Sequence, residues 1–153
     1  MRRYYKELGI ESQLQNLTIS MFTDEGSVNS VFPKLKGKAN ETRHVLPCIF
    51  EILQNPLVND ESDYCKYRLS AVTCLCRFYG FIDSPKFFLS PDIAAEVETC
   101  ASDFLDCYSW LTDYSIERGH MKWQLTIKFH YLKHGANLAQ FLNPKFGSTY
   151  TAE

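Results

Sequence analysis

Two histidines near the C-terminal end of the sequence have the spacing of a metal site. His130 and His134 lie four residues apart in "KFHYLKH", which places their imidazole rings on one side of a helix. A catalytic zinc ion also needs a third ligand and an activating acid. Tyr131 and Lys133 occupy the neighbouring positions, so there is no HExxH motif, and a basic segment repels a cation. We therefore predict two partly buried structural histidines that hold no metal.

The six cysteines have no spacing that indicates a metal or redox site. No CxxC pair occurs, and the four thiols of the middle region lie in apolar helical patterns (Cys74, Cys76, Cys100 and Cys107). Without a secretory signal, these patterns favour six reduced thiols, most of them buried. A pairing of His44 with a cysteine, as nucleophile and base, stays open but has no local support. GxSxG, phosphate-loop and dinucleotide motifs are missing, so no cofactor or small-molecule substrate is indicated.

Charge is unevenly distributed along the chain. Residues 51–117 contain twelve acidic and four basic residues, whereas residues 118–152 contain five basic residues and no acidic one. Such a segment can be a nucleic-acid face, or it can dock on the acidic middle of the same fold. The second interpretation is favoured, because five bases over 35 residues are not dense. The candidate DNA-binding residues are Arg118, Lys122, Lys128, Lys133 and Lys145.

The composition indicates one folded domain over residues 1–153. Apolar residues make up 45% of the sequence and aromatic residues 14%, which is typical of a globular core. There is no apolar run of the roughly 18 residues that a membrane span requires, and no apolar signal segment follows the N-terminus. We expect an intracellular protein, nuclear or cytoplasmic, without a membrane partner.

Helical periodicity predicts an all-α fold of four to five helices packed as an irregular bundle. A first helix is expected within residues 2–16, and a second through residues 43–55, where Pro47 must lie in the first turn or kink the helix. Val45, Leu46, Ile49, Phe50 and Leu53 form its apolar stripe. The third helix is expected to start with Asp60 as N-cap and Asp63 in its first turn, and to end at Tyr79 with Gly80 as C-cap. Its inner face comprises Leu69, Val72, Leu75, Cys76 and Tyr79.

The fourth helix has the clearest boundaries. Ser90 is its predicted N-cap, Pro91 its first residue, and Gly119 ends it after about 25 residues. Its inner face comprises Ile93, Val97, Cys100, Phe104, Cys107, Tyr108, Leu111 and Tyr114, whereas Asp103 and Asp106 belong to a solvated face.

A last helix is predicted from Thr126, its N-cap, to Asn143-Pro144. Strand-like alternation competes over residues 125–131, but the length of the segment favours a helix. The expected buried stripe of this helix comprises Ile127, Tyr131, His134, Leu138 and Phe141.

Residues 14–153 resemble a block of the repetitive, mobile-element-like open reading frames that are abundant in dinoflagellate genomes. "KFHYLKH", an apolar helix and "LNPKFGSTYTAE" carry the resemblance, together with the upstream stretch "LTISMFTDEGSVNSVFPKLKGKANETRHVLPCIFEI". A looser likeness extends to the C-terminal region of RNase H-like cut-and-paste transposases. There, a K-x-H-x-L-x-H helix precedes an aromatic residue and a glutamate close to the third catalytic acid. The matching residues here are Lys128, His130, Leu132, His134, Tyr150 and Glu153.

Two positions depart from the family pattern. Ile127 stands where a proline is expected, and the acidic cluster after Tyr150 is reduced to Glu153. The resemblance implies a fragment of a longer, transposon-derived protein that is cut where the acidic block begins. No alternating strands that could form an RNase H sheet are evident, so the fragment is expected to be catalytically inert alone.

Three functions follow from these observations. The resemblance and the basic tail favour a transposon-derived helical segment that associates with DNA. The aromatic-rich composition is compatible with a small all-α module that binds another protein chain. An enzyme that uses the histidine pair and a cysteine is the least favoured.

Overall fold

The computed structural model describes residues 5–6, 39–60, 62–120 and 122–147, and the side chains of its first long helix from residue 43 onward. The helices are α2 (Ala39–Gln54), α3 (Asp63–Ile82), α4 (Pro91–Glu117), α5 (Ile127–Asn137), η2 (Leu138–Gln140) and α6 (Pro144–Gly147). These described ranges contain no strand, so the all-α prediction is confirmed. The helix expected within residues 2–16 lies outside the described residues, apart from Tyr5 and Lys6.

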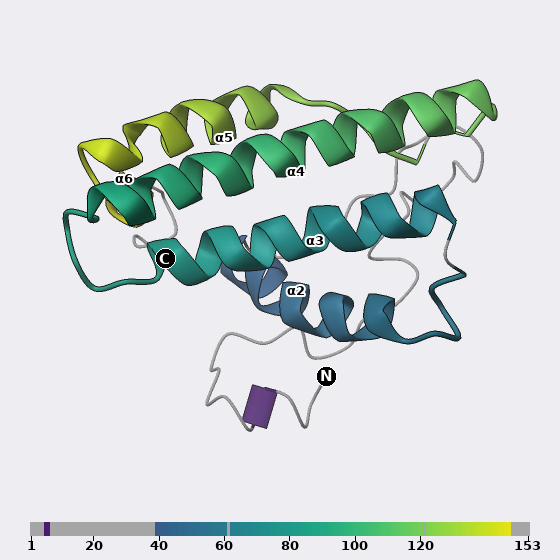
Figure 1. Cartoon of the computed structure of the whole chain (residues 1–153), viewed down its shortest axis with the longest axis horizontal. Coiled ribbons are helices and arrows are strands. Elements are labelled where there is room, and N and C mark those ends of the chain that lie inside the picture. Colours follow the sequence, from purple (N-terminus) through teal and green to yellow (C-terminus); the bar gives the residue numbers. More distant parts are fainter. Residues whose placement is uncertain (1–4, 7–38, 61, 121, 148–153) are drawn as a thin grey trace.

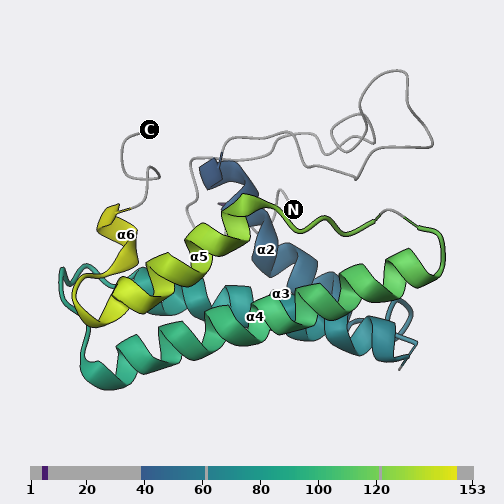
Figure 2. The same ribbon diagram turned by 90° about the horizontal axis from the view of Figure 1, so that it is seen from above.

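The long helices α3 and α4 form the centre of the molecule. They run antiparallel and side by side, with α2 against α3 and α5 against α4 (Figures 1 and 2). One core cluster lies near the α3–α4 turn and includes Phe78, Ile82, Val97 and Cys100. The other cluster lies further along α4, around Ala71, Phe104 and Leu111. The helix pair is therefore the platform that positions α5.

The predicted boundaries of α4 are confirmed. Ser90 is the N-cap and Pro91 the first residue, as the sequence pattern indicated. Gly119 adopts a positive φ of 69°, which a residue with a Cβ atom rarely tolerates. Its N–H donates to the carbonyl of Ile116 at 2.9 Å, and the N–H of His120 donates to the carbonyl of Ser115 at 2.8 Å. These bonds form a Schellman motif, which ends the helix.

The predicted caps of α3 are wrong at both ends, although Asp63 lies in its first turn as predicted. Ser62, not Asp60, is the N-cap, because its side chain accepts a hydrogen bond from the N–H of Cys65 at 3.3 Å. Asp60 instead accepts a hydrogen bond from the N–H of Ser62 at 3.1 Å. Its hydrogen bonds with the Ser62 side chain, then with Cys65 and with the Ser62 backbone, lower the pKa of Asp60 to about 2. Gly80 is not a C-cap. The helix continues to Ile82, which is buried in the core. The burial of Ile82 offsets the destabilisation of about 1 kcal/mol that a glycine within a helix causes.

The predicted inner faces of the first two described helices are confirmed in part. In α2, Val45 is buried and the other four stripe residues are half-buried or less. Pro47 lies inside the helix, because α2 already begins at Ala39. In α3, the five predicted residues are all half-buried, since the fully buried positions are Cys65, Ala71, Phe78 and Ile82. The predicted stripe of α4 is buried or half-buried throughout.

Helix α5 is shorter than predicted, and a different face of it is buried. Thr126 is its N-cap, but the α-helix ends at Asn137 and a short 3-10 turn follows before α6. The predicted buried stripe is wrong, because Ile127, Tyr131, Leu138 and Phe141 are 57–66% exposed. His134 is exposed as well. The residues that meet α4 are Phe129, Leu132, Ala136 and Ala139.

Candidate interaction surface

The outer face of α5 carries large apolar side chains that no other described element covers. Ile127, Tyr131, Leu138 and Phe141 recur at helical spacing, and we call these four residues the outer stripe. Isolated exposed apolar residues are common, but several large ones along one face mark an interaction site more often. The exposed His134 lies between Tyr131 and Leu138 on the same face. The outer stripe extends over an α-helix and a 3-10 turn, which corresponds to about 20 Å.

The inward face of α5 explains why the larger side chains lie outside. Ala136 and Ala139 are each 1% exposed, within the core cluster shared with α4. Small side chains let two helices approach closely, while Phe129 and Leu132 fill the space near the start of α5. Two apolar stripes therefore share this helix, and the one with small residues faces the core. The spacing of Phe129, Leu132, Ala136 and Ala139 is the sequence signal that could have indicated this arrangement.

A group of exposed aromatic side chains lies at the end of the outer stripe. Phe87 contacts Phe88 and Phe146, with ring centroids 5.1 Å and 5.2 Å apart. These rings are 52%, 67% and 40% exposed for Phe87, Phe88 and Phe146, respectively. The backbone N–H of Asn143 donates to the carbonyl of Phe87 at 2.9 Å, which brings the α3–α4 turn beside α6. The structure thus adds three exposed phenylalanines that were not among the sequence candidates.

Asn143 fixes this end of the molecule. It is fully buried, and its side-chain NH₂ donates to the carbonyls of Ile82, Ser84 and Lys86 at 3.0–3.2 Å. Its side-chain oxygen accepts from the N–H of Lys145 at 3.0 Å. One side chain therefore satisfies several backbone groups of the α3–α4 turn and fixes the position of α6.

The other end of α5 is held by a polar and aromatic network. The hydroxyl of Tyr108 donates to the carbonyl of Gln124 and accepts from its N–H, both at 3.3 Å. The indole N–H of Trp123 donates to the hydroxyl of Tyr64 at 3.3 Å. The Phe129 ring lies 4.5 Å from that of Tyr108. These contacts position the connection between α4 and α5, and with it the start of the outer stripe.

The five basic candidates differ in their surroundings. Lys133 donates to the hydroxyl of Ser102 on α4 at 2.6 Å, and Lys145 lies 3.8 Å from the carboxylate of Asp83. These two contacts agree with the interpretation that the basic segment docks on the acidic middle of the fold. Arg118 stacks on the ring of Tyr114, 3.5 Å from its centroid, and lines a cavity of about 210 Å³ with His120 and Lys122.

Lys128 differs from Lys133, the other lysine of α5. It is exposed at the start of α5, and no ion pair joins it to another described residue. The first turn of α5 contains no acidic residue, and the side chain of its N-cap residue Thr126 makes no capping hydrogen bond. The start of α5 is consequently electropositive, through both Lys128 and the helix dipole.

The two histidines contact each other on the exposed side of α5. Their Nε2 atoms lie 2.9 Å apart, and their rings are nearly perpendicular at 86°. When both rings are neutral, one Nε2 donates a hydrogen bond to the other. The expectation that the histidines are partly buried is wrong, since both are exposed. The described residues contain no group of three metal-ligating side chains, and the absence of a metal stays a prediction.

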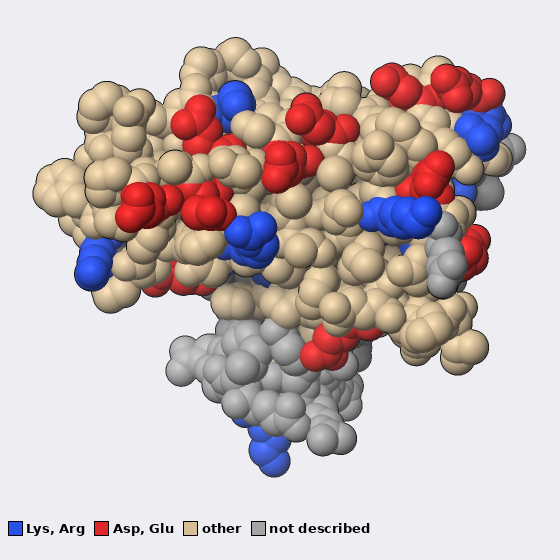
Figure 3. All heavy atoms as spheres, in the orientation of Figure 1, with Lys and Arg blue, Asp and Glu red and all other residues tan. Residues whose placement is uncertain are grey.

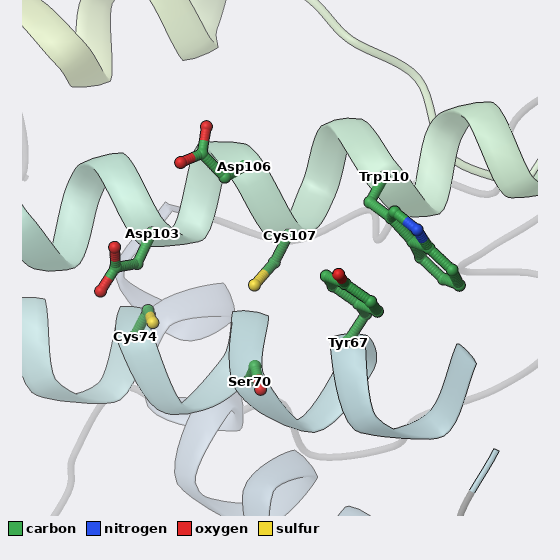
Figure 4. A pocket seen from close by; sticks show the side chains of 7 residues that line it. All are labelled: Tyr67, Ser70, Cys74, Asp103, Asp106, Cys107 and Trp110. Carbon is green, nitrogen blue, oxygen red and sulfur yellow. The ribbon is translucent and has the colours of Figure 1, made fainter. Parts of the chain in front are cut away.

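A groove of about 440 Å³ between α3 and α4 holds thiols and carboxylates but no complete catalytic group (Figure 4). Burial, followed by the nearby Cys107 and Asp103, raises the pKa of Cys74 to about 11. Burial also raises the pKa of Cys107. The described lining residues include no histidine or lysine that could remove a thiol proton. Tyr67 and Trp110 stack at 4.0 Å and form one end of the groove.

The remaining candidates from the sequence are the cysteines, His44, Tyr150 and Glu153. All six cysteines are free in this fold, three of them buried and three half-buried, so half of them and not most are buried. That the thiols are reduced stays a prediction. Burial, followed by the charge of Arg43, lowers the pKa of His44. Within the described part of the chain, no hydrogen bond joins His44 to a thiol. Tyr150 and Glu153 lie outside the described residues.

No family model matches the chain, and neither the curated proteins nor the solved structures show a significant match to it. None of the described helices combines the length and apolar character needed to cross a membrane. Figure 3 shows mainly uncharged atoms over α5 and α6, whereas acidic side chains follow α4.

Proposed function

We propose that this protein is a small all-α interaction module whose outer stripe binds another polypeptide. The observation that supports this function is the exposure of Ile127, Tyr131, Leu138 and Phe141 along one side of α5 and the 3-10 turn that follows it, whose other side is packed on α4. Burial of a large apolar side chain contributes about 1.5–3 kcal/mol, so a partner that covers these four residues gains substantial binding free energy.

The surroundings of the outer stripe favour an ordered docking surface. Asn143 fixes one end through buried hydrogen bonds, and Tyr108 and Trp123 position the other end. A surface that is already ordered loses little conformational entropy when it binds. Helix-in-groove and helix-on-helix recognition use apolar residues at this spacing.

A pair of matched double variants tests the proposal. Tyr131→Ser with Leu138→Ser removes apolar area from the outer stripe, and Ile52→Ser with Leu57→Ser removes exposed apolar area near the α2–α3 connection. A fluorescent, amphipathic helical peptide serves as the probe. We expect the first variant to weaken binding at least about tenfold and the control to leave it unchanged. Equal binding by all three proteins contradicts the proposed function.

Both variants are expected to remain folded, because they change exposed side chains. Equal thermal unfolding midpoints therefore establish that a loss of binding comes from the surface and not from unfolding.

DNA association within a transposon-derived protein stays a prediction. Arg118, Lys122 and Lys128 are the basic candidates whose side chains are directed to solvent or to a surface cavity. Lys133 and Lys145 already have partners within the fold. A nucleic-acid face needs several cations along one surface, so the apolar face supports protein binding better.

A further inference from the structure

We infer that the partner of the outer stripe is an amphipathic helix with acidic residues beside its apolar face. This inference rests on the proposed function and adds the charge of the partner to it. It starts from Lys128, whose position follows that of Ile127 by one residue, or about 100° around the helix. Lys128 therefore flanks the outer stripe and does not lie within it.

Three features of the start of α5 favour negative charge on the partner. Lys128 is exposed and has no ion pair among the described residues. The first turn of α5 contains no acid, and the Thr126 side chain does not cap it. Residues 118–152 include no acidic residue at all. An acidic side chain of the partner would gain from both the lysine and the helix dipole.

The length of the outer stripe also suits a helix. Its extent of about 20 Å corresponds to roughly 14 residues of a partner helix. Tyr131 and Leu138 lie seven residues apart, which is two turns of α5. A partner helix with leucine or phenylalanine at matching intervals can contact both side chains along one line.

A second copy of this chain fits less well. If α5 pairs with α5 of another copy, Lys128 meets a segment that also lacks acidic residues. Seven of the eighteen acidic residues lie on α4, where no comparable row of large exposed apolar residues accompanies them. Exposed apolar and acidic residues do occur together near the α2–α3 connection, at Ile52 and Leu57 beside Glu51 and Asp60. Leu57 and Asp60 lie in the connection between two helices and not along one helical face, so a separate acidic helix is favoured over a second copy.

Two synthetic peptides of about 18 residues test the inference. Both have leucine and phenylalanine at the same helical positions, and one carries glutamates and the other lysines beside this face. Binding to the full chain is measured by fluorescence anisotropy at low and high salt. We expect the glutamate peptide to bind at least about fivefold more tightly at low salt, and we expect this preference to shrink as salt rises.

Charge reversal provides the sharper comparison. Lys128→Glu should weaken binding of the glutamate peptide and strengthen binding of the lysine peptide. Lys66→Glu changes the net charge equally, but Lys66 lies on α3 and pairs with Asp63, so it should affect neither peptide appreciably. This control separates a local contact of Lys128 from the effect of net charge.

Each alternative outcome has a distinct meaning. Equal binding of both peptides, unchanged by Lys128→Glu, overturns the acidic partner but leaves the proposed function in place. Failure of both peptides to bind overturns the inference and the proposed function together. Sedimentation that shows a dimer, lost in Tyr131→Ser with Leu138→Ser, overturns the inference in favour of a second copy.

Discussion

The side chain of Asn143 donates a hydrogen bond to the carbonyl of Ile82 at 3.0 Å, across 61 positions of sequence. The same NH₂ group also reaches the carbonyls of Ser84 and Lys86. This contact connects the end of α3 with the segment that follows α5. Consequently, the position of the exposed aromatic group and the end of the outer stripe depend on one buried amide.

Replacing Asn143 by alanine should lower the free energy of unfolding by about 2–4 kcal/mol, because several buried carbonyls lose their donor. Gln140→Ala is the matched control. Gln140 is exposed and donates only to the carbonyl of Asn137, so its loss should cost less than about 0.5 kcal/mol. Urea unfolding of both variants measures the difference. Equal stability of the two variants contradicts the role assigned to Asn143.

The orientation of α5 predicts that substitutions at two nearby positions change the free energy of unfolding by very different amounts. Ala136 is 1% exposed against α4, so Ala136→Leu should overpack the core and destabilise by about 1–3 kcal/mol. Leu138 is 57% exposed, so Leu138→Ala should change stability by less than about 0.5 kcal/mol. Thermal and urea unfolding check both values. A large loss of stability for Leu138→Ala would mean that Leu138 is buried, as the helical periodicity of the sequence predicted.

The helical class and the ends of α4 could be predicted because local signals determine them. Ser90, Pro91 and Gly119 act through capping and backbone conformation, which short stretches of sequence encode. The extension of α3 past Gly80 could not be predicted in this way, since it depends on the burial of Ile82 against other helices.

Helical periodicity could not predict the orientation of α5 either. Ile127, Tyr131 and Leu138 have larger apolar side chains than Ala136 and Ala139, and apolar size alone favours them for the core. Close packing on α4 instead selects the small residues. The bonds of Asn143 join distant segments, and no local pattern specifies such contacts.

We expect the protein to lose stability at alkaline pH, because the pKa of a partly buried thiol is raised in the folded chain. Burial raises the pKa of Cys74 from its usual value of 9.0 to about 11. The unfolded chain therefore releases this proton at a lower pH than the folded chain. The stability that this difference contributes is full below pH 9 and is lost as pH rises to about 11.

Urea unfolding between pH 8 and pH 11 measures this dependence. The wild-type chain should lose stability over this interval more steeply than Cys74→Ala, so that the difference between the two proteins narrows as pH rises. Parallel curves would mean that the pKa of Cys74 is not raised in the folded protein.

Duplex DNA binding should depend steeply on salt if it occurs. Because Lys133 and Lys145 have partners within the fold, we expect no retention of the chain on duplex DNA at about 150 mM salt. Any binding at low salt should be abolished by Lys128→Glu with Lys133→Glu. Electrophoretic mobility shifts over a salt series check this. Sequence-selective binding at 150 mM salt would favour DNA association over protein binding.

Mapping of backbone amide chemical shifts tests the central claim most directly. The isotope-labelled chain is titrated with the glutamate-flanked peptide, and the perturbed amides are assigned to positions in the fold. The account predicts that the perturbations concentrate around Ile127, Tyr131, Leu138 and Phe141 and spare the outer face of α4. Perturbations centred on the groove between Tyr67 and Trp110, or none at saturating peptide, would contradict the assignment of the outer stripe as the binding surface.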